Sequence, residues 1–444
     1  MNIESLLDER LGPIQKVEQV QNEYAIFSEY HTYSATINKI SQYLNWRPDF
    51  IGSGTSLDKN KAYYAAIGEA IERYCGNFIP NNLMKSTING LKDDCYLSPN
   101  VFLQFTKEQM NRKGFPFSTF KDDEVFEWSE SVSLTDNKKY WIPAEFVYLN
   151  YWLYRKDIKK VQQRPILLSG IAAGQNTNHA TISGLLEIIE RDSTMIWWLG
   201  RQSQTEILVS KGDFLYQKII KGLPASYEIR WYLLPSDFSV YTVACSLIDL
   251  DNQIFSLGFA TRFSANEALE KSAGEAFQLR KLSLNLLDRS NQIWKDPNYK
   301  DYLGIKNYRK DRNYAQSFNN DWKDMYSLMH NVQYFLDPTT WDWALKRLES
   351  KEKVLLKNMC NINSNNQLNY LIEEFRKNKM SAYLVDVTTE DILQTNYRVV
   401  RVISPEACPN MPTGLPMLNN NRLLEKINLS SEKNSFDLSP MPHS

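Results

Sequence analysis

The sequence has few of the residues on which many classes of enzyme depend. Of its 444 residues, only four are histidines and five are cysteines, and no two cysteines are spaced as C-x-x-C. This odd, scattered set of cysteines argues against a disulfide framework or a structural zinc site. The G-x-S-x-G, H-E-x-x-H, Walker A and G-x-G-x-x-G motifs are also missing. Any chemistry must therefore rest on carboxylates, arginines and amides.

The sequence also lacks an excess of either charge and lacks long apolar segments. The 51 lysines and arginines oppose 52 aspartates and glutamates, for a net charge of −1, so no basic field exists to attract nucleic acid. The N-terminal residues have no apolar core of the kind found in signal peptides. The apolar runs are too short and too polar to cross a bilayer. The composition predicts a cytoplasmic protein that binds neither nucleic acid nor membrane.

What is present is enough apolar material for a large core. Hydrophobic residues make up 43% of the chain and aromatic residues 13%, which excludes disorder for most of it. Apolar periodicity predicts helices at 57–75, 178–199, 264–287 and 365–379, and strands at 25–37, 139–152, 227–234, 240–249, 253–262, 381–387 and 397–403. Residues 288–345 have the composition of loops and short helices. The absence of a low-complexity linker predicts one large α/β or α+β domain.

The expected helix ends have recognisable signals. Thr55 or Ser56 is the predicted N-cap of the first helix, and Gly76 its C-terminal stop. The second helix is predicted to stop at Gly200. Ser264 and Glu267 form a capping-box pattern at the start of the third.

Each of the three long helices carries the same short pattern, two acidic or amide side chains three residues apart with an arginine close behind. The segments are Gly68-Glu69-Ala70-Ile71-Glu72-Arg73, Leu186-Glu187-Ile188-Ile189-Glu190-Arg191 and Gly274-Glu275-Ala276-Phe277-Gln278-Leu279-Arg280. Residues three apart share one face of a helix, so each pair points its oxygens in one direction. Small residues precede each leading glutamate on that face and would let the helix approach a neighbour closely. The two residues between the members of each pair are apolar and should be buried.

A single helix with this pattern is usually a surface helix whose glutamates pair with their own arginine. Three such helices favour a different interpretation, because glutamates among isoleucines, leucines and tryptophans are costly to bury unless they are paired or metal-bound. Converging carboxylates repel one another and need cations between them. Oxygen ligands without histidine favour Mg²⁺, which bridges carboxylates to nucleotide phosphates, and arginines suit phosphate oxygens. The residues alone therefore predict a magnesium-dependent nucleotide site.

These segments resemble the signatures of the YcaO family. Gly52–Cys75 is similar to the first signature, Ser169–Gly174 followed by Gly184–Asp192 to the second, and Ala268–Arg280 to the third. The segment Tyr397–Pro405 and the proline-containing C-terminus are also similar to the family's end. The resemblance implies a single YcaO-like domain over residues 1–444, with β-sheets and long carboxylate-bearing helices around an ATP site. It also implies a loop-rich insertion at about 288–345 and a functional tail at 433–444.

The resemblance implies the site residues by match to the family's motifs. The implied Mg²⁺ ligands are Glu69, Glu72, Glu187, Glu190 and Glu275. The same residues would contact ATP together with Arg73, Gln175, Arg191, Lys271 and Gln278. Several positions depart from the family's pattern: alanine replaces a frequent serine at 65 or 66, Ser53 replaces a lysine, Gln175 an asparagine, His179 a glutamate and Lys271 an arginine.

The C-terminus ends Pro440-Met441-Pro442-His443-Ser444. Prolines two residues apart favour an extended, pre-ordered arm. The family's tail ends in three alternating prolines beside the nucleotide, and here serine replaces the last of them. The resemblance therefore implies a catalytic role for Pro440, Pro442, His443 and Ser444, in which the terminal carboxylate or His443 accepts a proton.

The implied activity is that of an ATP- and Mg²⁺-dependent cyclodehydratase, which phosphorylates backbone amides and converts Cys, Ser or Thr of a ribosomal precursor peptide into thiazoline or (methyl)oxazoline. The YcaO-like region begins almost at the N-terminus, which is similar to stand-alone subunits that rely on a leader-binding ThiF-like partner. A flavin-dependent azoline dehydrogenase is a further expected partner, and a homodimer within a larger complex is the expected assembly. The alternatives are thioamide or amidine formation by the same activation, or a catalytically weak scaffold subunit that ATP binding would distinguish from the enzymes.

Overall fold

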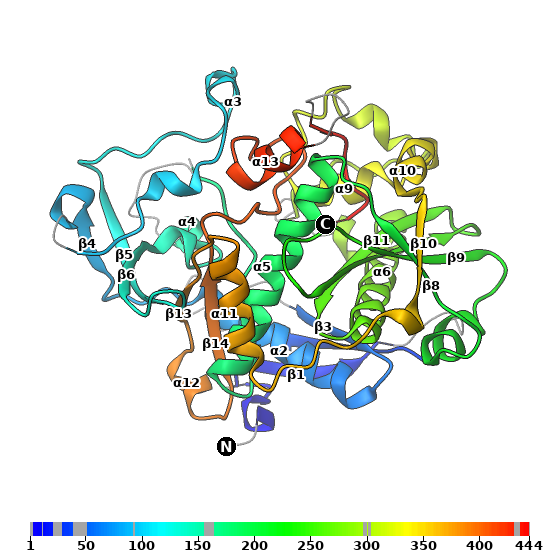
Figure 1. Ribbon diagram of the computed structural model, residues 1–444, viewed down its shortest axis with the longest axis horizontal. Helices are drawn as coiled ribbons and strands as arrows, with labels where there is room; N and C mark the ends of the chain where they lie inside the picture. The colour runs from blue at the N-terminus through cyan, green and yellow to red at the C-terminus, as the bar shows by residue number, and fades with distance from the viewer. Residues whose placement is uncertain are drawn as a thin grey trace.

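The computed structural model describes residues 3–10, 12–20, 29–38, 51–91, 94–154, 164–295, 300, 303–429 and 436–443. Within these residues the chain forms three β-sheets (Figure 1). The first is antiparallel, in the order β1 (Ile14–Gln19), β2 (His31–Ile37) and β3 (Ile51–Ser56). The second has the order β11 (Ile254–Arg262), β10 (Tyr241–Asp249), β9 (Tyr227–Leu233), β8 (Thr205–Leu208) and β12 (Glu352–Leu355). Only β12 pairs in parallel among these five strands, with β8.

The third sheet brings together strands that are distant in the sequence. Its order is β4 (Met84–Thr87), β5 (Val125–Ser133), β13 (Tyr383–Asp386), β14 (Arg398–Ile403) and β7 (Ile171–Gly174), and β6 (Lys139–Pro143) also pairs with β5. Its pairings are antiparallel. One end of this order is therefore β7, just as β3 and β11 end the orders of their own sheets.

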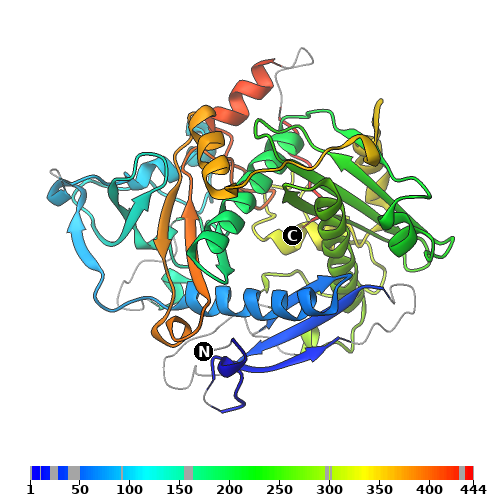
Figure 2. The same ribbon diagram turned by 60° about the horizontal axis from the view of Figure 1, so that its bottom comes forward.

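Three long helices follow these three edge strands. They are α2 (Lys59–Asn77) after β3, α5 (Thr177–Leu199) after β7 and α6 (Ala265–Leu287) after β11. The connections are residues 57–58, 175–176 and 263–264, so each unit has the form edge strand, short turn, long helix. In Figure 2, α2 runs below the mark of the C-terminus, α5 lies to its left and α6 to its right. The three helices thus frame the centre of the molecule.

The remaining helices in the described residues are short. They are α3 (Lys107–Asn111), α4 (Tyr151–Tyr154), α7 (Gln292–Lys295), α9 (Leu328–Tyr334), α10 (Trp341–Leu348), α11 (Gln367–Lys377), α12 (Glu390–Leu393) and α13 (Asn421–Leu429). Part of the 288–345 segment packs on the C-terminal half of α6, where Leu286 contacts the cluster that contains Tyr314 and Val332. No helix of the described chain has the length and apolar character that a membrane crossing requires.

Glycines on the edge strands let two of the long helices lie directly against them. A Cβ atom added to Gly54 of β3 would lie 2.1 Å from the carbonyl oxygen of Ala62 in α2. One added to Gly258 of β11 would lie 2.1 Å from the carbonyl oxygen of Ser272 in α6. Side chains at these positions would push the helix off its strand. The close approach predicted from the small helix residues is therefore made to a strand, and it fixes how far each carboxylate lies from the strand backbone.

Most of the predicted elements are confirmed, and the errors concern their ends. Helix α5 matches its prediction with Gly200 as its C-cap, and β9, β10 and β11 match within about one residue. The N-cap of α2 is Asp58, whose carboxylate accepts from the amides of Asn60 and Lys61, so the assignment of Thr55 or Ser56 is wrong because β3 extends through both. Gly76 lies inside α2, and the C-cap is Phe78.

Two other boundary predictions need correction. Ser264 is the N-cap of α6, but its side chain makes no capping hydrogen bond there, so the predicted capping box with Glu267 is wrong. The strand predicted at 139–152 ends at Pro143 and gives way to a 3₁₀ turn at Ala144–Phe146, because proline has no N–H with which to continue a ladder. Of the strand predicted at 25–37, residues 31–37 form β2, and 25–28 lie outside the described residues.

Candidate functional site

The leading glutamates of α2 and α5 are held by the backbone just ahead of their own helix. Oε2 of Glu69 accepts hydrogen bonds from the amide of Ser53 at 2.6 Å and from its hydroxyl at 3.1 Å. Oε2 of Glu187 accepts from the amide of Gly170, immediately before β7, at 3.0 Å. An edge strand has one side without a partner strand, and its free amides need acceptors. The carboxylates supply these acceptors.

The second member of each pair reaches the strand of the next unit. Glu72 of α2 accepts from the amide of Ala173 in β7 at 2.7 Å, and Glu190 of α5 accepts from the amide of Thr261 in β11 at 2.8 Å. Gln278 of α6 donates to the hydroxyls of Thr55 at 3.0 Å and Ser53 at 3.4 Å, both in β3. The first unit therefore contacts the second, the second the third, and the third the first. We call Glu69, Glu72, Glu187, Glu190, Glu275 and Gln278 the carboxylate ring.

Burial and mutual repulsion raise the pKa values of three carboxyl groups in the carboxylate ring. Loss of solvent and the neighbouring Glu69 and Glu187 raise the pKa of Glu72 to about 8. Loss of solvent and the charge of Glu275 raise the pKa of Glu190 to about 7, and burial also raises the pKa of Glu187. Since Glu187 affects the pKa of Glu72 and Glu275 that of Glu190, carboxylates of all three helices lie close enough for their charges to interact. A cation between them would remove both the repulsion and the desolvation penalty.

Basic side chains border the carboxylate ring. Nη2 of Arg73 lies 2.5 Å from Oε1 of Glu69, and Nζ of Lys271 lies 3.3 Å from Oε1 of Glu275. Lys271 and Arg191 hold the pKa of Glu275 below its usual value in spite of burial. Gln175 instead lies exposed in the turn between β7 and α5, where it hydrogen-bonds the hydroxyl of Tyr397.

Arg191 connects the carboxylate ring to the C-terminal tail. Its Nη1 lies 2.8 Å from Nε2 of His443, and its Nε lies 3.6 Å from Oε1 of Glu190. Because a guanidinium only donates hydrogen bonds, Nε2 of His443 is the acceptor, and Nδ1 carries the proton and donates to the carbonyl of Leu257 at 3.0 Å. Burial and the adjacent Arg191 lower the pKa of His443 to about 4. The imidazole is therefore neutral at ordinary pH, and its acceptor nitrogen is engaged by the hydrogen bond from Arg191.

The tail is packed into the molecule along its described part, 436–443. The carbonyl of Pro442 accepts from the amide of Leu257 in β11 at 2.8 Å, and Nε1 of Trp198 donates to the carbonyl of Ser439 at 2.8 Å. Met441 and His443 are buried. The described tail therefore lies against α5 and β11. Ser444 and residues 433–435 lie outside the described residues, and the roles predicted for Pro440, Pro442, His443 and Ser444 stay predictions.

The arrangement fits a hard cation, although the carboxylates do not converge on one point. Among the described residues, no three His, Cys, Asp or Glu side chains form a group that would hold a metal. Glu69 and Glu275 are turned toward Arg73 and Lys271, and the other ring glutamates are bound to backbone amides. Their raised pKa values and their oxygen-only chemistry are those of a site that a divalent cation would stabilise. The assignment of these residues as ligands stays a prediction.

Sequence reasoning missed the strand atoms and one arginine of the site. The amides of Ser53, Gly170, Ala173 and Thr261 carry no side-chain signal that marks them as partners. Arg401 is almost fully buried and donates to the carbonyls of Leu167 and, at 2.9 Å, Leu168, the residues just before the Ser169-Gly170 turn. Its signal was available, since a charged residue stands between valines in Val399-Val400-Arg401-Val402.

Replacing Glu72 by glutamine should flatten the pH dependence of stability when Mg²⁺ is removed with EDTA. A carboxyl whose pKa is 4.5 in the unfolded chain and about 8 in the folded protein binds more protons when folded, so stability falls as pH rises through that window. Glutamine keeps an acceptor for the amide of Ala173 and cannot ionise. In thermal melts, the Tm of the variant should therefore rise relative to that of the wild-type chain as the pH approaches 8. Added Mg²⁺ should reduce this difference in Tm. Parallel pH profiles of Tm would contradict the raised pKa.

Comparisons with known proteins identify the family and the fold of the chain. Residues 53–408 match the family model described as YcaO cyclodehydratase, ATP- and Mg²⁺-binding. The structure is similar to that of a heterocyclase in complex with substrate and cofactor, with a TM-score of 0.69 and 16% identity, over 100% of this chain and 57% of that one. It is also similar to YcaO from Methanopyrus kandleri bound with AMPPCP and Mg²⁺, with a TM-score of 0.58 and 18% identity, over 91% of each chain.

A third similar structure is a chain of the E. coli microcin synthetase McbBCD complex, with a TM-score of 0.60 and 18% identity over 96% of each chain. An uncharacterized protein of Methanothermobacter thermautotrophicus is 26% identical over 246 residues, which are 52% of this chain and 57% of that protein. The chain thus spans only 57% of the length of this relative and of the heterocyclase. Since the family match extends over well more than half of the chain and contains all three long helices, the chain belongs to the YcaO family of ATP- and Mg²⁺-binding cyclodehydratases.

Proposed function

We propose that the chain is an ATP- and Mg²⁺-dependent cyclodehydratase that converts Cys, Ser or Thr of a ribosomal precursor peptide into thiazoline or (methyl)oxazoline. The observation that carries the proposal is the carboxylate ring, in which buried or half-buried glutamates of three helices lie close enough for their charges to raise the pKa values of Glu72 and Glu190, beside Arg191. Isolated glutamates at these depths would be costly to keep. A site that binds Mg²⁺ and a nucleotide would explain why these carboxylates are present.

The reaction needs an activated leaving group. When a side chain of the peptide attacks the preceding backbone carbonyl, the adduct reverts unless its oxygen departs, and phosphorylation by ATP makes departure favourable. Mg²⁺, held by Glu69, Glu72, Glu187, Glu190 and Glu275, would neutralise phosphate charge. The planar fork of Arg191 suits bidentate contact with phosphate oxygens. The substrate brings its own nucleophile, which fits a chain with few histidines.

The proposal is tested by the mass of the product. Incubation of the chain with MgATP, a partner protein and a precursor peptide rich in Cys, Ser and Thr should remove one water per modified residue. Thioamide formation would instead replace one oxygen atom by sulfur, which raises the mass of the peptide. A chain that neither binds ATP nor modifies the peptide would favour the scaffold alternative.

Arg191→Lys should lower kcat by about tenfold or more, because lysine keeps the charge and loses the fork that grips two oxygens at once. It should also lose the contact with Nε2 of His443. Arg230→Lys is the matched control, since Arg230 is exposed and pairs with Glu228 at 3.2 Å, on the surface of β9. Steady-state ATP hydrolysis with peptide measures the effect. Equal kinetics for the two variants would mean that Arg191 acts only as a structural partner of Glu190.

The chain is expected to bind MgATP alone and to modify peptide slowly until a leader-binding, ThiF-like partner is added. The motivation is that a similar solved chain belongs to a synthetase complex, McbBCD. Calorimetry with MgATP and rate measurements with and without the candidate partner test this expectation. A leader-bearing peptide processed at the same rate with and without the partner would contradict it.

A further inference from the structure

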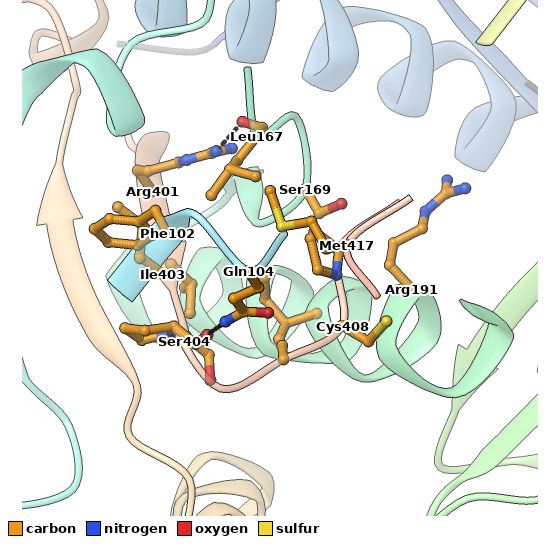
Figure 3. Close-up of a pocket in the computed structure, with 15 residues that line it drawn as sticks. Phe102, Gln104, Leu167, Ser169, Arg191, Arg401, Ile403, Ser404, Cys408 and Met417 are labelled. Carbon is orange, nitrogen blue, oxygen red and sulfur yellow. Dashed lines mark hydrogen bonds between the residues drawn. The ribbon is translucent and has the colours of Figure 1, made fainter. Parts of the chain in front are cut away.

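A cavity beside α5 adjoins the proposed reaction centre. It has an empty volume of about 490 Å³, including its open mouth. Its wall is mostly apolar and includes Phe102, Leu167, Ile188, Val402, Ile403 and Met417. Figure 3 shows Phe102 and Ile403 at one end and Arg191 at the other, with the guanidinium of Arg191 pointing away from them.

The polar end of the cavity is shared with the carboxylate ring. Arg191 lines the cavity and also contacts Glu190 and His443. Ser169 lines it too, and the next residue, Gly170, donates its amide to Glu187. A peptide whose carbonyl oxygen lies at Arg191 would therefore have neighbouring side chains within reach of the apolar wall.

The charge of the cavity restricts which side chain it accepts. Arg191 and Arg401 both line it, and none of the described residues in its wall is acidic. A lysine or arginine side chain would thus lose its hydration without gaining a carboxylate partner, and the positive charges of the two nearby arginines would repel it. Cys408 lines the wall, but burial raises the pKa of its thiol well above the usual value, so it supplies no anion. An uncharged apolar side chain is the occupant that this lining favours.

We propose that the cavity binds the apolar side chain of the peptide residue that supplies the carbonyl to be phosphorylated, and so sets the sequence preference of the enzyme. The inference rests on the proposed function for the direction of the peptide. The apolar wall provides affinity through burial of hydrocarbon surface. Arg191 keeps the carbonyl at the phosphate end, and exclusion of cationic side chains provides selectivity.

The test uses small probes that need no partner and no turnover. The chain, saturated with Mg²⁺ and a non-hydrolysable ATP analogue, is titrated with acetyl-leucine methylamide and acetyl-lysine methylamide. The leucine probe should bind at least about tenfold more tightly than the lysine probe. Under ultraviolet light, acetyl-photoleucine methylamide should label residues of the cavity wall such as Ile403 or Met417. Equal binding of both probes, or labelling only outside the cavity, would overturn the proposal.

A second test of the proposal fills the cavity with a larger side chain. Ala407, which is buried and lines the wall, changed to phenylalanine should weaken leucine-probe binding about tenfold or more, and Ala407→Val less so. Binding of the nucleotide analogue by calorimetry should stay unchanged in both variants, which shows that they are folded. Retained leucine binding in a folded Ala407→Phe protein would refute the assignment. Failure of the proposed function appears separately, as wild-type protein that does not bind the nucleotide.

Discussion

Replacing Glu190 by glutamine should reduce peptide-dependent ATP hydrolysis by about a hundredfold or more and leave the protein folded. Glutamine keeps an oxygen for the amide of Thr261, which Glu190 now binds at 2.8 Å. What it removes is the negative charge that would face Mg²⁺ and, through it, the phosphates, an interaction that contributes several kcal/mol to a phosphoryl-transfer transition state. Because burial and the charge of Glu275 raise the pKa of Glu190 to about 7, loss of its charge should not destabilise the Mg²⁺-free chain.

The chain offers a closely matched control for this variant. Glu374 of α11 is also a buried glutamate that accepts from a backbone amide, that of Ser239 at 2.6 Å. Glu374→Gln makes the same chemical change outside the carboxylate ring and should leave kcat near the wild-type value. Steady-state hydrolysis at saturating Mg²⁺, with Tm measured alongside, compares the two. If Glu190→Gln turns over at the wild-type rate, the proposed magnesium site is wrong.

The three carboxylate-bearing helices were predictable because their signal is local. Spacing of three within each pair places both side chains on one face, and the apolar residues between them, Ile71 and Ile189 among others, are buried as expected. The two halves of each pair nevertheless have different partners. Which strand amide each one meets depends on the order of strands in three sheets, and β7 joins its sheet through β14, more than 200 residues away in the chain. A short segment of sequence therefore cannot predict which strand each carboxylate contacts.

The interpretation of the arginines shows the same limit. The alternative in which each glutamate pairs with its own arginine is realised at Glu69 and Arg73. It describes Arg191 only in part, because Arg191 contacts Glu190 of its own helix and also, 252 positions away, His443. The contact with His443 requires the tail to return to the centre of the molecule. The prolines two residues apart favour an ordered arm, and the resemblance to the YcaO family implied that the tail lies beside the nucleotide.

Deleting Ser439–Ser444 should lower kcat for peptide modification by about tenfold or more while ATP still binds. The deletion removes the acceptor of Arg191 and leaves the amide of Leu257 without Pro442. It also removes Met441 from its cluster with Trp198 and Phe259, and the indole N–H of Trp198 loses the carbonyl of Ser439. A moderate fall in Tm is therefore expected as well. Pro442→Gly should be milder, because the backbone carbonyl stays and only rigidity is lost.

Single substitutions at His443 separate a positioning role from proton transfer. Nε2 of His443 holds Arg191, and the pKa of about 4 makes its imidazole a weak base, so the geometry favours positioning. His443→Gln retains an oxygen acceptor at a similar reach and should keep much of kcat, whereas His443→Ala should lose it, with little change in KM for ATP. A proton-accepting role predicts instead that both variants are equally impaired and that the acid limb of the pH–rate profile disappears. If the alanine variant retains full kcat, Arg191 is held without the imidazole, and the tail contributes only through its backbone contacts with β11.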